Sequence, residues 1–380
     1  MTVLAQKLAL KGPRKLLALD GGGIRGVMTL EVLRVIERTV RDMSGSPQLM
    51  LGDYFDYIGG TSTGAIIAAC LACGMSVDEV LRFYVAQGPV MFQKASLLKR
   101  LYYEYEAEPL ARELRSKLGR DAAGNDRKLG DESLRCLLLL VLRNFTTDSP
   151  WPLSNNPAAK YNDRDRSDCN LELPLWKLVR ASAAAPTYFP PEMVRVGQKD
   201  FLFVDGGVTT YNNPAFLLFL MSTLEPYRLC WPATEDQLLL VSVGTGTDPS
   251  VESQLGSGPN LLQNARSLPP ALMYAALNQQ DTLCRVFGRC VSGAELDSEI
   301  GDLCSFTKGP VERRLFRYVR YNSELTEAGM RQLDVPAQDP VPLRALDSIE
   351  HVGALRSVGQ AIGRLQVQPS HFEGFVEVAQ

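Results

Sequence analysis

Residues 15–26 read KLLALDGGGIRG, an apolar run that ends in an aspartate and three consecutive glycines. The run Lys15–Asp20 has the composition of a strand that is buried on both faces of a parallel sheet. The next stretch, Val27–Val40, repeats apolar residues at helical spacing and places Glu and Arg on its other face. A buried strand, a glycine turn and an amphipathic helix predict the first unit of an α/β sheet.

Strands and helices continue to alternate along the chain. We predict further strands at Tyr54–Ile58, Cys136–Phe145, Phe201–Val204 and Gln237–Val243, and helices at Ala65–Cys73, Val77–Ala86, Glu172–Ala185, Leu261–Phe287 and 346–365. Residues 146–168 are rich in Asn, Pro and Asp and are predicted to form a loop. The sequence therefore predicts an α/β fold, with a mostly parallel central sheet flanked by helices on both faces.

Two regions differ from this alternation. We predict a core of residues 1–259 and a mainly helical extension, residues 260–380, which packs on the same domain and contains one arginine-rich strand, Arg313–Tyr321. Within the core, residues 89–130 interleave aromatic side chains with Lys and Glu. That pattern suits either a surface helical hairpin or a cover that faces lipid, and both interpretations stay open.

The composition excludes several classes of protein. Of the 380 residues, 45% are hydrophobic and 22% are charged, as in soluble globular proteins, and the formal net charge of −3 provides no basic field for nucleic acid. No apolar stretch approaches the roughly 18 residues of a membrane span. The eight cysteines are scattered, without a disulfide framework or paired zinc spacing. We expect a cytoplasmic protein with reduced thiols.

The histidine count restricts the chemistry further. The chain has only two histidines, His351 and His371, and both lie in its last thirty residues. A multi-histidine metal site is therefore nearly excluded, and we expect neither a metal nor a cofactor. A Ser-His-Asp triad would have to recruit its base from the end of the sequence.

A serine between two glycines follows the second predicted strand. The segment Gly60-Thr61-Ser62-Thr63-Gly64 stands between a strand and a helix, which is the arrangement of a nucleophile elbow. Glycines permit the sharp turn and leave room for an approaching substrate. The alternative is an ordinary tight turn.

Two other glycine clusters also follow predicted strands. Gly21-x-Gly23-x-x-Gly26 matches a dinucleotide fingerprint, but no acid ends a strand about twenty residues later. The alternative use is an anion cradle or oxyanion hole made by backbone N–H groups. The other cluster is Asp205-Gly206-Gly207, and Asp205 is the candidate general base because no histidine precedes residue 351. An aspartate that bonds its own turn is the alternative.

Five blocks together resemble the patatin-like phospholipases. These are DGGGIRG at 20–26, GTSTG at 60–64, SAAAPTYFPP at 182–191, DGG at 205–207 and SVGTG at 242–246. The resemblance covers about residues 15–250 and implies a three-layer patatin-like fold and a Ser–Asp dyad acyl hydrolase that acts on the glycerolipids of a phospholipid membrane. Many members have DGA where this chain has DGG, a change next to a backbone turn.

The resemblance also implies roles for individual residues. Carried over by motif, Ser62 is the nucleophile and Asp205 is the base that activates it. Backbone N–H groups around Gly22, Gly23 and Ile24 would form the oxyanion hole, and Arg25 would brace that loop.

A narrower resemblance concerns the bacterial cytosolic members of the family, including the cyclic-nucleotide-activated phospholipases of anti-phage defence. It rests on the chain length, on the elbow near residue 60 and on NQQDTLCRVFGR at 278–289. The candidate site for a cyclic dinucleotide activator is a set of arginines interleaved with aromatic residues: Arg313, Arg314, Arg317 and Arg320. A solvated edge strand with salt-bridged arginines is the alternative. A homo-oligomer is compatible with this class.

Two rival functions stay open at this point. The chain order Ser62, Asp205, His351 also occurs in α/β-hydrolase triads. A non-catalytic regulatory module could instead use Gly21–Gly26 to bind a nucleotide.

Overall fold

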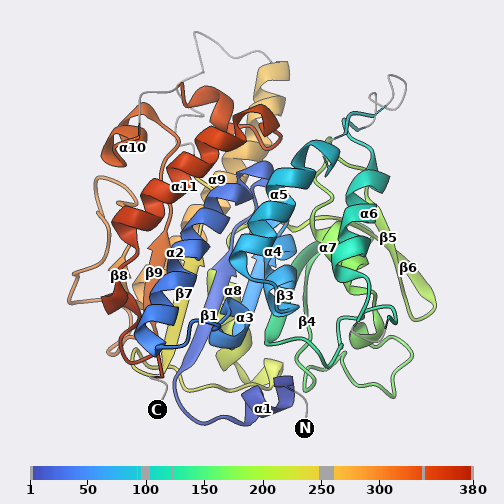
Figure 1. Ribbon diagram of the computed structural model, residues 1–380, viewed down its shortest axis with the longest axis horizontal. Helices are drawn as coiled ribbons and strands as arrows, with labels where there is room; N and C mark the ends of the chain where they lie inside the picture. Colours follow the sequence, from blue (N-terminus) through green and yellow to red (C-terminus); the bar gives the residue numbers. More distant parts are fainter. Residues whose placement is uncertain are drawn as a thin grey trace.

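A single mixed sheet runs through the whole molecule in the computed structural model (Figure 1). The structure describes residues 3–91, 93–95, 103–121, 124–247, 261–335 and 339–377. Within these ranges the strands are β1 (Arg14–Leu19), β2 (Tyr57–Thr61), β3 (Leu137–Asn144), β4 (Ser149–Ser154), β5 (Glu192–Val196), β6 (Lys199–Asp205), β7 (Leu238–Val243), β8 (Arg289–Ser292) and β9 (Arg317–Tyr321). Their order is β5-β6-β3-β2-β1-β7-β9-β8, and β4 pairs with β3.

The central strands are parallel, as predicted. Strand β1 pairs in parallel with β2 and β7, β2 with β3, and β9 with β7 and β8. The antiparallel pairs join β3 to β4 and β6, and β5 to β6. The sheet is therefore mostly parallel, with an antiparallel region on the side of β3.

Helices cover both faces of the sheet (Figure 1). They are α1 (Val3–Ala9), α2 (Gly26–Ser44), α3 (Leu51–Tyr54), α4 (Thr63–Ala72), α5 (Val77–Met91), α6 (Ala107–Leu118), α7 (Leu175–Ser182), α8 (Ala215–Thr223), α9 (Leu261–Phe287), α10 (Glu327–Gln332) and α11 (Val352–Gln366). Alternate residues of β1 enter different cores: Leu17 and Leu19 pack with α2, α4 and α11, whereas Leu16 and Ala18 pack with α8 and α9. This alternation follows from the two-residue period of a strand. None of these helices, in the part of the chain that is described, is long and apolar enough to cross a bilayer.

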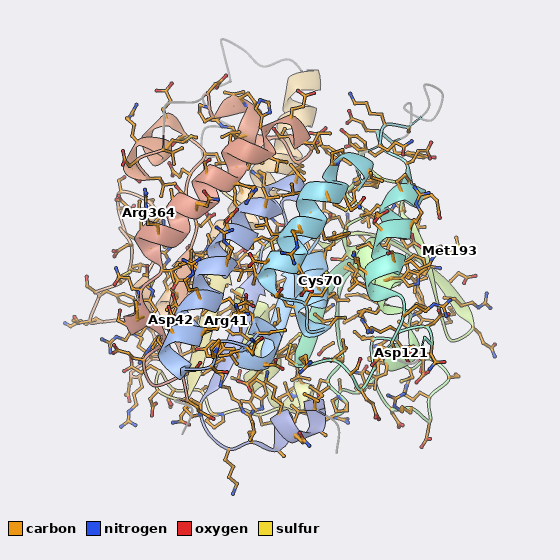
Figure 2. The ribbon with its side chains drawn as sticks, viewed as in Figure 1. Arg41, Asp42, Cys70, Asp121, Met193 and Arg364 are labelled. Atoms are coloured by element: carbon orange, nitrogen blue, oxygen red, sulfur yellow. The ribbon has the colours of Figure 1, made fainter. Side chains whose placement is uncertain are left out.

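Several sequence predictions were wrong in detail. The predicted strand Arg313–Tyr321 begins at Arg317, and the helix predicted over 346–365 begins at Val352. Strand β2 begins at Tyr57 and not at Tyr54, because Leu51–Tyr54 turn into the short helix α3. The predicted loop 146–168 contains β4, whose two prolines are tolerated because β4 pairs only with β3. Strand β5 was not predicted; Figure 2 shows its exposed Met193 at the margin of the molecule, where side-chain burial is weak.

The extension beyond residue 260 is not a separate layer of helices. Its strands β8 and β9 continue the main sheet, and β8 was not predicted. Its helix α11 packs on α2 closely enough that a Cβ on Gly359 would lie 2.6 Å from the carbonyl oxygen of Met28. The proposed boundary near residue 259 lies outside the described residues.

The region predicted as a hairpin or lid is described only in part. Helix α5 continues to Met91, and the backbones of residues 93–95 and 104–106 hydrogen-bond to each other before α6 begins. The residues between them include 96–102, which carry Leu97, Leu98, Leu101 and Tyr102 of this pattern and lie outside the described ranges.

Candidate active site

Ser62 occupies the turn between β2 and α4 and has backbone angles of φ 55° and ψ −122°. A non-glycine residue with positive φ is strained, and such strain is typical of functional sites. The flanking glycines make the turn sterically feasible. A Cβ on Gly60 would lie 2.1 Å from the carbonyl oxygen of Gly64, and a Cβ on Gly64 would lie 2.2 Å from that of Leu19.

Strand β3 aligns Ser62 with Asp205. Thr61, the residue before the serine, pairs with Val141, and Asp205 at the end of β6 pairs with the next residue, Leu142. The Ser62 hydroxyl donates a hydrogen bond of 2.6 Å to Oδ2 of Asp205. The other carboxylate oxygen, Oδ1, accepts the N–H of Gly207 at 2.6 Å. The two residues are 143 positions apart, yet they form a hydrogen-bonded dyad.

The environment of Asp205 suits a general base. Its side chain is buried, and this desolvation raises the pKa of Asp205 to about 6, although hydrogen bonds from Ser62 and Gly207 and the charge of Arg180 act in the opposite direction. A carboxylate with a pKa near the operating pH is a much stronger base than an exposed aspartate. At pH 7 the group is ionised and able to accept the serine proton.

The glycine loop after β1 lies beside the serine. The Gly21 N–H donates to the carbonyl oxygen of Asn212 at 3.1 Å, and the Thr245 hydroxyl donates to the Gly21 carbonyl oxygen at 2.9 Å. The N–H groups of Gly22 and Gly23 donate to no acceptor among the described residues. Both glycines line the same cavity as Ser62 and are therefore available as oxyanion donors.

The next two residues of this loop are used differently. The Ile24 N–H donates to the carbonyl oxygen of Leu346 at 2.8 Å, so this N–H is already engaged. Arg25 donates from its backbone N–H and from Nε to the carbonyl oxygen of Gly22, at 3.2 and 3.3 Å. In this conformation Gly22 and Gly23 are the free donors, while Ile24 and Arg25 hold the shape of the loop.

A cavity of about 890 Å³ opens onto the dyad. Its apolar wall includes Ile66, Met91, Phe189, Met273 and Leu277. Polar groups enter it from Arg25, Glu104 and Arg344. An apolar cavity that is lined by a few polar groups can accept a molecule with a long hydrocarbon chain.

Sequence reasoning missed two residues that support the dyad. The Ser62 N–H donates to the Ser182 hydroxyl at 3.0 Å, and this hydroxyl donates in turn to the Val141 carbonyl oxygen at 2.6 Å. Arg180 is fully buried, and its guanidinium lies 5.3 Å from the centre of the Phe189 ring. Ser182 opens the SAAAPTYFPP block, but a serine at the end of a helix carries no signal of its own.

The alternative triad is not formed. Nδ1 of His351 lies 3.0 Å from the hydroxyl oxygen of Ser348, and both carboxylate oxygens of Asp205 have other partners. His351 also does not line the cavity.

The side chains of the four arginines proposed as an activator site have different surroundings. Arg320 is buried and forms an ion pair with Asp20, whereas Arg313 is exposed. Arg314 and Arg317 each donate to a backbone carbonyl and lie over a different phenylalanine ring. Strand β9 lies between β7 and β8, so the alternative of an edge strand is wrong.

Comparison with known proteins places the chain in a family. A model described as patatin-like phospholipase matches residues 17–219, more than half of the chain. This protein therefore belongs to the patatin-like phospholipase family.

Individual relatives match the chain over a similar or larger share of its length. The chain is 32% identical over 221 residues to a cGAMP-activated phospholipase of Vibrio cholerae serotype O1, which covers 55% of this chain and 57% of that protein. It is 28% identical over 248 residues to Patatin-17 of Solanum cardiophyllum, which covers 61% and 60%. VipD of Legionella pneumophila aligns over 91% of this chain and 67% of its own, with a TM-score of 0.35 and 13% identity. The chain thus spans less than two thirds of the length of each of these two phospholipase and patatin relatives.

Proposed function

We propose that this protein hydrolyses the acyl ester bonds of glycerophospholipids, as a phospholipase of the A type. The observation that carries the proposal is the 2.6 Å hydrogen bond from Ser62, on a strained turn, to the buried carboxylate of Asp205. The apolar cavity around this dyad suits a lipid acyl chain. Membership of the patatin-like phospholipase family supports the same chemistry.

The reaction proceeds in two halves. Asp205 accepts the hydroxyl proton of Ser62, whose oxygen attacks the ester carbonyl carbon, and the N–H groups of Gly22 and Gly23 stabilise the negative oxygen of the tetrahedral intermediate. The intermediate collapses to an acyl-Ser62 ester and an alcohol, which takes the proton from Asp205. A water molecule then attacks the acyl ester while Asp205 accepts its proton. Collapse of this second intermediate releases the fatty acid, and Asp205 returns the proton to the Ser62 oxygen.

A covalent label tests the nucleophile directly. A lipid-like fluorophosphonate should phosphonylate Ser62, because the reagent mimics the tetrahedral intermediate of acyl transfer. We expect mass spectrometry to locate one adduct on the peptide that contains Ser62, and we expect no adduct in Ser62→Ala. Equal labelling of the wild type and of Ser62→Ala would contradict the proposed nucleophile.

The pH profile tests the base. Because the pKa of Asp205 is raised to about 6, kcat/KM should fall as the pH is lowered through about 6 and should level off above it. A histidine could produce a similar limb, so the matched control is His351→Ala. In this variant, kcat/KM should still fall below about pH 6 and should still level off above it. Loss of the limb in His351→Ala would assign the titration to the histidine.

We further propose that a cyclic dinucleotide stimulates the hydrolysis, because a relative that is 32% identical is named as a cGAMP-activated phospholipase. Since Arg314, Arg317 and Arg320 are engaged by other groups of the protein, this proposal names no binding residues. Calorimetric titration with a panel of cyclic dinucleotides, paired with hydrolysis of anionic liposomes, tests it. We expect one member of the panel to bind and to raise the rate. Full activity without any nucleotide, and no binding across the panel, would leave an unregulated lipase.

A further inference from the structure

Asp20, the residue before the three glycines, is anchored from a distant strand. Arg320 of β9 donates from its two terminal nitrogens to the two carboxylate oxygens of Asp20, at 3.0 and 2.6 Å. Both side chains are almost completely buried. Arg320 also donates to the Ser242 hydroxyl on β7 at 2.7 Å. A bidentate ion pair of this kind restricts the orientation of the carboxylate as well as its position.

We propose that Arg320 is a positioning residue that sets the direction of the oxyanion donors through Asp20. The inference rests on the proposed function, because it assumes that Gly22 and Gly23 stabilise the oxyanion. The Asp20 N–H donates to the carbonyl oxygen of Val243 at 3.2 Å, so both the backbone and the side chain of this residue are held. Because Gly22 is only two residues later, the fixed position of Asp20 also restricts the position of the Gly22 backbone.

A second contact from the extension reaches the other end of the same loop. The carbonyl oxygen of Leu346 accepts a hydrogen bond from the N–H of Ile24. The same oxygen would lie only 2.1 Å from a Cβ on Gly23. Arg320 and Leu346 both lie beyond residues 17–219, which match the family model. The extension therefore restrains the free donors Gly22 and Gly23 from both sides.

The competing explanation is that Asp20–Arg320 only stabilises the fold. The chain offers a matched control, because Arg285 of α9 forms a similar buried pair with Asp281 at 2.9 and 2.8 Å. Arg285 also donates to the carbonyl oxygens of Ala294 and Asp302, and among the described residues it makes no hydrogen bond to the glycine loop. A purely structural role would make the two pairs behave alike.

The experiment compares Arg320→Lys with Arg285→Lys on phospholipid vesicles, well below the melting temperature of each. Lysine keeps the positive charge but cannot form a bidentate ion pair with the carboxylate. Misplaced donors weaken transition-state binding more than substrate binding. We therefore expect kcat of Arg320→Lys to fall about tenfold or more, with KM changed less than about threefold. Arg285→Lys should lose a comparable amount of thermal stability and keep its kcat.

Each other outcome has a defined meaning. If the two variants lose kcat equally, or if Arg320→Lys changes only KM, the positioning role is wrong. If Arg320→Lys does not fold, Asp20→Asn replaces it, since an amide nitrogen then faces one guanidinium nitrogen and the bidentate pair is lost; an unchanged kcat would then overturn the inference. If the wild-type protein shows no Ser62-dependent hydrolysis, both the proposed function and this inference are refuted. If hydrolysis is present but the two lysine variants do not differ in kcat, only this inference is refuted.

Discussion

Ser62→Ala is expected to lower phospholipid hydrolysis by about 10³-fold or more, because the acyl intermediate forms on the Ser62 hydroxyl. Asp205→Ala should cost about 10²- to 10⁴-fold, the usual contribution of a general base. The double variant should be no slower than Ser62→Ala, since the two residues act as one unit. Initial rates on a fluorescent phospholipid, with circular dichroism to verify folding, measure these effects.

His351→Ala is the control for this series. The histidine belongs to the same protein and was the rival base, but its ring contacts Ser348 and lies outside the cavity. The variant should retain nearly full activity. A folded His351→Ala protein without activity would contradict the dyad and favour a triad.

Gly22→Ala and Gly23→Ala should each reduce kcat by about 10²-fold or more, the usual effect of losing an oxyanion donor. A Cβ on Gly22 would lie 2.2 Å from the Thr245 hydroxyl oxygen, and one on Gly23 would lie 2.1 Å from the Leu346 carbonyl oxygen. The loop must move to relieve either clash, and its N–H groups move with it. Steady-state kinetics on phospholipid vesicles measure the loss.

Gly45→Ala provides the matched control for Gly23→Ala. Both glycines have positive φ, 69° at Gly45 and 59° at Gly23, so alanine costs a similar backbone strain of about 1 kcal/mol at each position. A Cβ on Gly45 meets nothing within 4 Å, and this residue caps the end of the 19-residue helix α2 that is opposite to the glycine loop. Gly45→Ala should therefore keep kcat. Equal kcat losses in the two variants would show that strain alone, and not donor displacement, explains the effect.

Features encoded within a few neighbouring residues could be predicted from the sequence. The strand before Gly21, the turn at Ser62 and the helix that follows it depend on local apolar periodicity and on glycine, which act over short stretches of chain. Helix α9 has the predicted limits, Leu261–Phe287. The family resemblance rests on the same local blocks and is confirmed by the match over residues 17–219. The edge strands β5 and β8 were missed because short, weakly buried strands have little pattern.

The partners of these local features were decided only by the tertiary structure. Arg320 belongs to a stretch of sequence in which arginines alternate with aromatic residues, and this pattern suggested a ligand site. Its burial against Asp20, 300 residues away, depends on β9 lying beside β7 and on β7 lying beside β1. The raised pKa of Asp205 likewise arises from burial by elements that are distant in sequence. Local sequence determines backbone conformation, whereas the order of strands in the sheet determines which charges meet and how far they are removed from water.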